Sequence, residues 1–328
     1  MNKKKKILII TPALADANNG NWQTAQRWAG LLSGAFDIEL QKTWEGQTCD
    51  LMIALHARRS AASITDFKAK TTAPLIVALT GTDLYRDIET DADAQRSLVL
   101  ADRLIVLNDL GAQRLPLALR DKTHVVLQST PMQASVQKTV ERLSVVMVGH
   151  LRSEKSPETF FQAAELLENK PDIEFIHIGA ALDDRYGAQA TALTQGLGNY
   201  TWLGAVGHAE ALKYIQQSHV LVHCSRMEGG AHVVMEAICA STPVLASRID
   251  GNVGLLGEQY PAYFEWGNAN ALANLLLEMR ASQTLADPEA GLLAQCRRAC
   301  EALAPRFHPD RERDALLALT HICLSSHH

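Results

Sequence analysis

Two glutamates in the second half of the chain flank a pair of glycines, and this arrangement could bind a phosphate-bearing ligand. Glu228 precedes Gly229 and Gly230, and Glu236 follows within a helical pattern over 231–240. Glycine lets a backbone approach a ligand closely, and the start of a helix offers unpaired N–H groups to an anion. The other interpretation is a glycine-rich turn with two solvated acids.

Basic residues follow an apolar run at 143–148. His150, Arg152 and Lys155 come after this run and precede a helical pattern at 157–168. Fixed cations and a helix N-terminus can stabilise negative charge on a ligand electrostatically.

Polar residues also follow strand-like runs in the first half of the chain. Those that could bind a ligand are Gly20, Asn21 and Thr24 after the run 7–10, His56, Arg58 and Arg59 after 51–55, and Thr82 and Asp83 after 75–79. Two adjacent arginines would suit a small anionic acceptor, because guanidinium groups bind phosphate oxygens in forks. Alternatively, both arginines pair with surface acids.

The elements that must position these residues alternate between strand-like and helical runs. Strands are expected at 6–10, 37–40, 51–55, 75–79, 103–107, 124–127, 143–148, 174–178, 200–203, 220–223, 243–246 and 262–264. Continuous Val/Ile/Leu runs are typical of parallel strands covered on both faces. Such a sheet binds its ligands at the carboxyl ends of the strands.

The alternation restarts near residue 143, after a polar stretch at 131–142. We therefore predict an α/β protein with two Rossmann-like, doubly wound parallel-sheet domains that face each other across a cleft. The first domain covers 1–138 and the second covers 139–305. A C-terminal helix at about 306–328 could pack back on the first domain.

Net charge, apolar run length and cysteine spacing exclude several classes of protein function. The 328 residues include 31 Lys+Arg and 36 Asp+Glu, and the net charge of -5 argues against a protein that mainly binds nucleic acid. No run approaches the ~18 apolar residues of a membrane helix, so we expect no stable membrane insertion. The six cysteines form no C-x-x-C pair and no zinc spacing, which suits a reducing cytoplasm.

The first residues imitate a signal peptide, with lysines followed by a short apolar run. The run is broken by Pro12 and leads directly into Asn18-Asn19-Gly20, so we interpret it as a first strand and its loop. The lysines at 3–6 are then a solvated flank, with a weak anchor to anionic lipid as the alternative.

Several motifs of the second half resemble those of a known enzyme family. Glu228 and Glu236 are separated by seven residues inside S-x-x-E-G-G-x-x-x-x-x-E-A, with P-V following. This resembles the E-x7-E signature of retaining, nucleotide-sugar-dependent glycosyltransferases of the GT-B fold, family 4. The segment V-G-H-L-R-S-E-K at 148–155 is similar to the family's V-G-R-L-x-x-x-K-G. The resemblance implies a UDP-sugar as co-substrate, without a metal or another cofactor.

The same resemblance implies roles for individual residues. Lys155, with Arg152, would support the departing diphosphate, Glu228 would hold hydroxyls of the donor sugar, and Glu236 would hold the ribose hydroxyls. The set that would bind the nucleotide sugar comprises Gly20, Asn21, His150, Gly229, Gly230, Ala231, His232 and Glu236. His150 stands where the family has an arginine, so either His150 or Arg152 could supply the second cation.

The acceptor side carries a narrower resemblance. The string N-G-N-x-x-T-A-x-R-W at 19–28 resembles one branch of the family, the selenosugar synthases of selenoneine biosynthesis, which join a UDP-sugar to selenophosphate. This implies transfer of an N-acetylglucosaminyl or glucosyl group, with release of UDP and phosphate. The acceptor residues would be Thr24, His56, Arg58, Arg59, Thr82 and Asp83, where Asp83 lies in a T-G-T-D turn similar to the family's acceptor-side loop.

Other functions are disfavoured or remain as alternatives. The chain lacks G-x-G-x-x-G after its first strand and lacks a P-loop, which disfavours a nicotinamide dehydrogenase and a P-loop enzyme. Asp91-Ala-Asp93 imitates a metal-binding D-x-D but lies in a polar stretch, where we expect a solvated helix start. An O-glycosyltransferase with a sugar or lipid-linked acceptor, and a non-catalytic nucleotide-sugar-binding protein, stay as alternatives. The preferred sugar, the anomeric outcome and the oligomeric state are left open.

Overall fold

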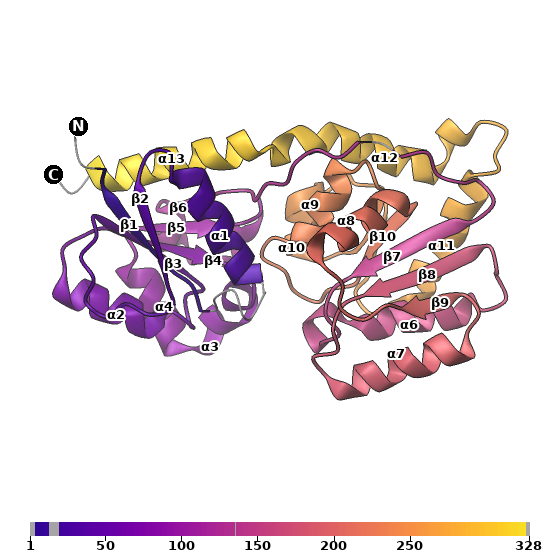
Figure 1. Cartoon of the computed structure of the whole chain (residues 1–328), viewed down its shortest axis with the longest axis horizontal. Coiled ribbons are helices and arrows are strands. Elements are labelled where there is room, and N and C mark those ends of the chain that lie inside the picture. The colour runs from indigo at the N-terminus through magenta and orange to yellow at the C-terminus, as the bar shows by residue number, and fades with distance from the viewer. Residues whose placement is uncertain (1–3, 13–19, 135, 326–328) are drawn as a thin grey trace. The chain divides into compact units, whose positions relative to one another are not determined.

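A computed structural model describes residues 4–12, 20–134 and 136–325. Contacts divide the chain into two units, one with residues 1–129, 228–232 and 308–328, and one with 130–227 and 233–307. Each unit has a parallel sheet with helices on both faces (Figure 1). The domain boundary expected at residue 138 lies inside the second unit and stays a prediction. Lys3, Asn18 and Asn19 lie outside the described residues.

The first unit is built from alternating strands and helices. Its elements are β1 (Lys6–Ile10), α1 (Gly20–Leu32), β2 (Asp37–Gln41), β3 (Leu51–Leu55), α2 (Ala61–Lys70), β4 (Leu75–Leu79), a π-helix (Asp83–Asp87), α3 (Ile88–Thr90), α4 (Ala92–Leu100), β5 (Arg103–Val106), α5 (Leu117–Arg120), β6 (Thr123–Val125) and α13 (Pro309–Ser325). The parallel strands run in the order β2-β1-β3-β4-β5-β6. The order reverses between β1 and β3, which is the switch point where such sheets bind ligands.

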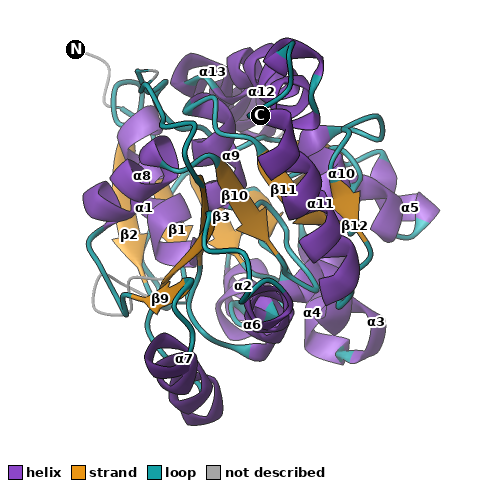
Figure 2. Cartoon of the chain, turned by 90° about the vertical axis from the view of Figure 1, so that its right-hand side faces the viewer, coloured by secondary structure: helices purple, strands orange, loops and turns teal. Residues whose placement is uncertain are grey.

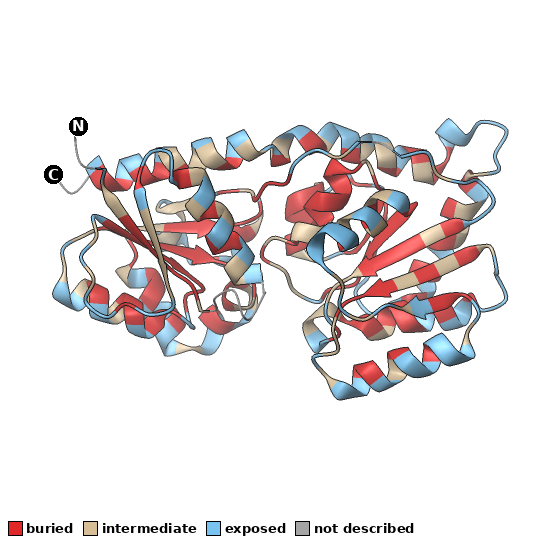
Figure 3. Ribbon diagram, in the orientation of Figure 1, coloured by how far each residue is buried: buried red, intermediate tan, exposed pale blue. Residues whose placement is uncertain are grey.

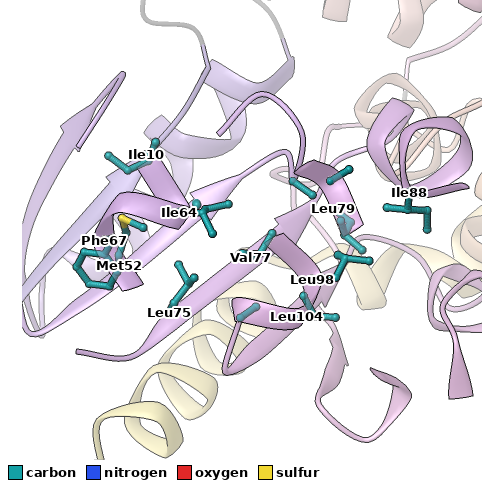
Figure 4. Close-up of a cluster of buried hydrophobic side chains, with 14 of the residues drawn as sticks. Ile10, Met52, Ile64, Phe67, Leu75, Val77, Leu79, Ile88, Leu98 and Leu104 are labelled. Atoms are coloured by element: carbon teal, nitrogen blue, oxygen red, sulfur yellow. The ribbon is translucent and has the colours of Figure 1, made fainter. Parts of the chain in front are cut away.

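Alternate side chains of each strand enter two separate cores. On one face, Leu8, Met52 and Val77 pack with Phe67 of α2 and Leu98 of α4 (Figure 4). The opposite face packs against α1 and α13. Because both faces are covered, the strands can be apolar throughout, and Figure 3 shows most of them as buried.

The C-terminal helix completes the second of these cores. Leu316, Leu319 and Cys323 of α13 pack with Trp28 of α1. In the first turn of α13, Glu312 is fully buried, and its carboxylate accepts hydrogen bonds from Trp28 Nε1 at 2.7 Å and Arg27 Nε at 2.9 Å. The described lysines of the N-terminal flank bond to neighbouring groups, Lys4 to backbone carbonyls and Lys6 to Glu39.

The second unit repeats the architecture. Its elements are β7 (Leu143–Val148), α6 (Pro157–Leu166), β8 (Ile173–Ile178), α7 (Asp184–Gly196), β9 (Tyr200–Trp202), α8 (His208–Gln217), β10 (Val220–His223), α9 (His232–Cys239), β11 (Val244–Ser247), α10 (Asp250–Leu256), β12 (Tyr263–Phe264), α11 (Ala269–Ser282) and α12 (Leu292–Leu303). The parallel strand order is β12-β11-β10-β7-β8-β9, so the switch point lies between β7 and β10. Figure 2 shows these strands with helices around them.

Strand positions agree closely with the sequence-based expectations. The expected strands at 6–10, 51–55, 75–79, 143–148 and 220–223 have the same bounds in the structure. Leu107 and Leu127 lie just outside β5 and β6, which end earlier than expected. Asp91 caps α4 by accepting a hydrogen bond from the Ala94 N–H, which confirms the helix start expected there.

Candidate active site

The loop after β7 carries three of the expected site residues. It runs past Gly149 into a short 3-10 turn at Ser153–Lys155, and the aliphatic stem of Lys155 lies over Gly149, where a Cβ would be 3.4 Å from its Cδ. Gly179, at the end of β8, has a φ of 151°, and a Cβ there would lie 2.0 Å from the Gly149 carbonyl oxygen. Only glycine permits this close approach of the two strand ends.

His150 sits in this loop as a neutral hydrogen-bond donor. Its Nδ1 accepts the Ala180 N–H at 3.1 Å, so the ring proton lies on Nε2. Burial, followed by the charges of Arg152 and Lys155, lowers the pKa of His150. The imidazole therefore differs from an arginine in carrying no permanent charge. Of the two candidates for the second cation, Arg152 is the charged one.

The loop after β10 is tied to the loop after β7. The Arg226 N–H donates to the Glu154 carbonyl at 2.9 Å, and the Arg226 guanidinium lies 5.9 Å from the centre of the Trp266 ring. Trp266 in turn donates to the Ser156 hydroxyl at 2.8 Å. These contacts hold the residue that follows Glu154, which is Lys155, at the carboxyl edge beside the switch point between β7 and β10.

Glu236 lies on α9 with a partner that the sequence motifs did not indicate. Its side chain is 6% exposed, and its Oε1 is 2.5 Å from Nε2 of His208, the first residue of α8. The hydrogen bond to Glu236 raises the pKa of His208 in spite of desolvation. His208 follows the loop after β9, so a third strand end contributes to this group.

In the first unit, Asp83 organises the loop after β4. Its side chain is fully buried, and its carboxylate accepts the N–H groups of Thr80, Gly81 and Ala57, each at 2.9 Å. The oxygens expected to orient a substrate hydroxyl therefore bind the chain's own backbone. In the structure, the Asp83 carboxylate joins the residues that follow β3 and β4.

His56 and Thr82 form a second link between these two strand ends. His56 has a φ of 70°, which is uncommon for a residue with a side chain. Its Nδ1 accepts the Arg59 N–H, and its Nε2 lies 3.1 Å from the Thr82 hydroxyl. Burial lowers the pKa of His56, which keeps the ring neutral. Thr82 is partly exposed, whereas His56 is buried.

The two adjacent arginines have different surroundings. Arg58 donates to the Asp87 carboxylate at 2.7 Å, and Asp87 also accepts from Arg86 at 3.0 Å. Arg59 is exposed, and its guanidinium forms no ion pair with the described residues. The alternative of pairing with an acid is thus confirmed for Arg58. Arg59 retains the capacity to bind an anion.

The start of α1 places its expected residues apart from these arginines. Gly20 is exposed at the first position of the helix and Asn21 is partly buried. Thr24 is buried, bonds to the Gly20 carbonyl, and lies 2.6 Å from the Gln128 amide. The hydroxyl of Thr24 therefore has protein partners, and Arg27 of the same motif binds Glu312.

The glycine pair at 229–230 approaches other parts of the protein. A Cβ on Gly229 would lie 2.5 Å from the Thr80 carbonyl group, and one on Gly230 would lie 2.8 Å from Leu107. Asn108 donates to the Gly229 carbonyl at 2.7 Å. The close approach that we expected toward a ligand is made here to protein backbone. Ala231 is buried beside them, and His232 lies 3.1 Å from the Ser129 carbonyl.

The expected site residues thus fall into two groups. His150, Arg152, Lys155 and Glu236 lie in the second unit, at the ends of its strands or on α9. The remaining ones, including the segment 228–232, belong to the first unit. His208 and Asn108 are polar residues of these groups that sequence analysis missed. Asn108 lies just after β5, and His208 begins the helix that follows β9; these positions are the signal that could have found them.

Comparison with known proteins relates part of the chain to a family. Residues 129–288 match the family model described as glycosyl transferases group 1. The matched segment spans most of the second unit. A comparison with curated proteins finds no match.

Solved structures share the fold of the whole chain. Sucrose-phosphate synthase from Thermosynechococcus elongatus has a TM-score of 0.77 at 16% identity, covering 98% of this chain and 100% of that one. Anabaena HepE, in complex with UDP and glucose, has a TM-score of 0.73 at 14% identity, covering 97% and 100%. S. aureus TarM has a TM-score of 0.64 at 15% identity; the match covers 82% of this chain and 55% of the length of TarM. These likenesses confirm the GT-B fold.

The transferase has no helix, within its described residues, that is long and apolar enough to cross a bilayer.

Proposed function

We propose that this glycosyltransferase transfers a hexosyl group, N-acetylglucosaminyl or glucosyl, from a UDP-sugar to selenophosphate. A lone pair of selenium attacks the anomeric carbon, and the bond from that carbon to the UDP oxygen breaks with its electron pair on the diphosphate. Water then cleaves the phosphorus–selenium bond, which releases phosphate and leaves the selenol of the sugar. No oxidant or reductant takes part.

The donor half of the proposal is supported by the loops at the switch point of the second unit. Lys155, held beside Gly149, and the exposed Arg152 supply positive charge at the carboxyl edge of β7. Preorganised cations of this kind stabilise a departing diphosphate electrostatically. The ribose hydroxyls can donate to Glu236, as acidic residues do in other nucleotide-binding sheets. HepE, with the same fold, was solved with UDP.

The acceptor half is carried by Arg59. Its guanidinium is exposed at the end of β3, beside the switch point of the first unit, and forms no ion pair with the described residues. A small anion such as selenophosphate would form charge-assisted hydrogen bonds with this cation, whereas a neutral sugar offers no charge for it to pair with. Selenophosphate is already a good nucleophile, so the reaction needs no strong side-chain base.

The decisive experiment mixes the protein with UDP-N-acetylglucosamine or UDP-glucose, with and without selenophosphate. We expect free UDP and a product with the selenium isotope pattern in mass spectra only when selenophosphate is present. UDP release with neutral sugar acceptors and none with selenophosphate would favour an O-glycosyltransferase. Binding of UDP without turnover of any acceptor would indicate a non-catalytic nucleotide-sugar-binding protein.

A further inference from the structure

The hydrogen bond between His208 and Glu236 joins two segments that are distant in sequence. Glu236 lies on α9, which follows the internal strand β10, and His208 starts α8, which follows the edge strand β9. The two atoms, Nε2 and Oε1, are 2.5 Å apart. The Glu236 side chain is 6% exposed and that of His208 is 66% exposed. An exposed side chain therefore holds a buried carboxylate.

A buried carboxylate needs such a donor. An ionised carboxylate only accepts hydrogen bonds, and burial without a charged or N–H partner is unfavourable. The bond to His208 limits the rotation of the Glu236 carboxylate. The position of His208 at a helix N-terminus disfavours a positive ring, yet its pKa is raised, chiefly by the hydrogen bond to Glu236. The pair is thus a stable one.

We propose that His208 is a positioning residue that orients the Glu236 carboxylate toward the ribose hydroxyls of the nucleotide. This inference rests on the proposed function, because it takes the ribose as the ligand of Glu236. His208 does not touch the reacting atoms. It sets the direction of the carboxylate, so its removal weakens the discrimination between ribose and deoxyribose more than it changes the chemical step.

The thiol nearest along α9 does not replace His208. Cys239 is buried with a raised pKa of about 11, so its thiol is neutral. It therefore cannot supply a charge-assisted hydrogen bond in place of the one from His208.

The test compares binding of UDP and 2′-deoxy-UDP by calorimetry in four proteins. H208A loses the donor, and H208Q keeps an N–H that can reach Glu236. H308N is the matched control, because His308 is also an exposed histidine beside an acid, Asp310, but lies at the start of α13. We expect H208A to bind UDP about tenfold more weakly, as for loss of one charge-assisted hydrogen bond.

The ratio of the two affinities identifies the role. In wild type and H308N, UDP should bind more tightly than 2′-deoxy-UDP. This preference should shrink in H208A and recover in H208Q, and in turnover assays H208A should raise the KM for the donor with little change in kcat. An unchanged preference in H208A would overturn the proposal, as would an equal loss in H208Q. Failure of the wild type to bind UDP would instead refute the proposed function, so the two failures are distinguishable.

Discussion

The carboxylate of Glu312 binds both the backbone and the side chain of Ser129. One of its oxygens, Oε2, accepts the Ser129 N–H at 2.8 Å and the Ser129 hydroxyl at 2.5 Å. Ser129 is the last residue of the first unit before the chain passes into the second. The next residue, Thr130, donates to the Phe307 carbonyl at 3.1 Å, where the chain returns. Glu312 therefore fixes the end of this segment to α13.

We expect Glu312→Gln to lower the free energy of unfolding by about 3 kcal/mol, because removing one partner of a buried ion pair leaves the other charge uncompensated. The glutamine side-chain amide would also place its own N–H groups against the N–H donors that the Glu312 carboxylate accepts. Denaturant unfolding measures the change. Asp314→Asn, at an exposed position of the same helix, is the control and should change stability little. Equal stability of the Glu312 variant and wild type would contradict this role.

Loss of Lys155 or Glu228 should abolish turnover while the fold is kept. Lys155→Ala removes the cation that supports the diphosphate, and Glu228→Gln removes the charge proposed to hold the sugar hydroxyls. We expect a decrease in kcat/KM of at least about a hundredfold for each, in the range seen when a transition-state donor is removed. UDP release reports the rate, and circular dichroism checks the fold. Rates like those of wild type in either variant would remove this mechanism.

The two arginines after β3 should contribute unequally to acceptor use. Arg58 is held by Asp87, and the hydrogen bond and charge of Asp87 raise the pKa of Arg58. Arg59→Ala should therefore raise the KM for selenophosphate about tenfold, and more than Arg58→Ala does, because loss of one charge-assisted contact to an anion is worth about this much. The double variant should weaken acceptor use more than UDP binding. If calorimetry shows a loss of UDP affinity alone, Arg59 is not an acceptor residue.

Asp83→Asn should disrupt the loop after β4. The carboxylate accepts three backbone N–H groups, and an amide has one oxygen to replace two. We expect a loss of about 2 kcal/mol in unfolding free energy, the typical result of leaving buried donors unsatisfied. Thermal unfolding measures it. Asp93→Asn, at an exposed site on α4, provides the comparison and should have almost no effect.

Acid should destabilise the second unit through His177. Burial lowers the pKa of this residue from 6.5 to about 3, and its ring packs against Phe160, Phe161 and Tyr200. Between these two pKa values the unfolded chain binds a proton that the folded chain does not, so stability falls as pH decreases from 6.5 toward 3. His177 alone should account for a loss of about 2 kcal/mol by pH 5.

His177→Phe tests this directly. The variant keeps an aromatic ring in the cluster but cannot take up a proton. Unfolding at pH 7 and pH 5 should show a smaller loss of stability than in wild type, while His308→Asn should follow the wild type. The same acid sensitivity in the Phe variant would show that other buried histidines, such as His219, are responsible.

Strand-length apolar runs and strand-end polar residues were enough to predict the fold and the positions of many site residues. β1, β3 and β4 could be predicted because strands covered on both faces are apolar throughout. The ends of β5 and β6 could not, since Leu107 continues the apolar run and yet leaves the sheet.

The surroundings of single residues could not be predicted in the same way. Arg58 and Arg59 are identical in type and adjacent, and only the fold brings Asp87 beside one of them. Glu312 resembles any acid in the first turn of a helix, although it is fully buried. Asp83 looked suited to a substrate hydroxyl because its three backbone partners depend on the arrangement of two strand ends. Tertiary contacts decide these roles, and no local pattern records them.

The place of α13 bears on how the protein is made. This helix is synthesised after the whole second unit, yet it covers a face of the sheet whose strands precede that unit in the chain. Until α13 is synthesised, Trp28 and its apolar neighbours in the amino-terminal half stay uncovered. The second unit, which ends at residue 307, can already fold during this time. We therefore expect the second unit to complete its fold before the first, against the usual amino-terminal-first order of co-translational folding.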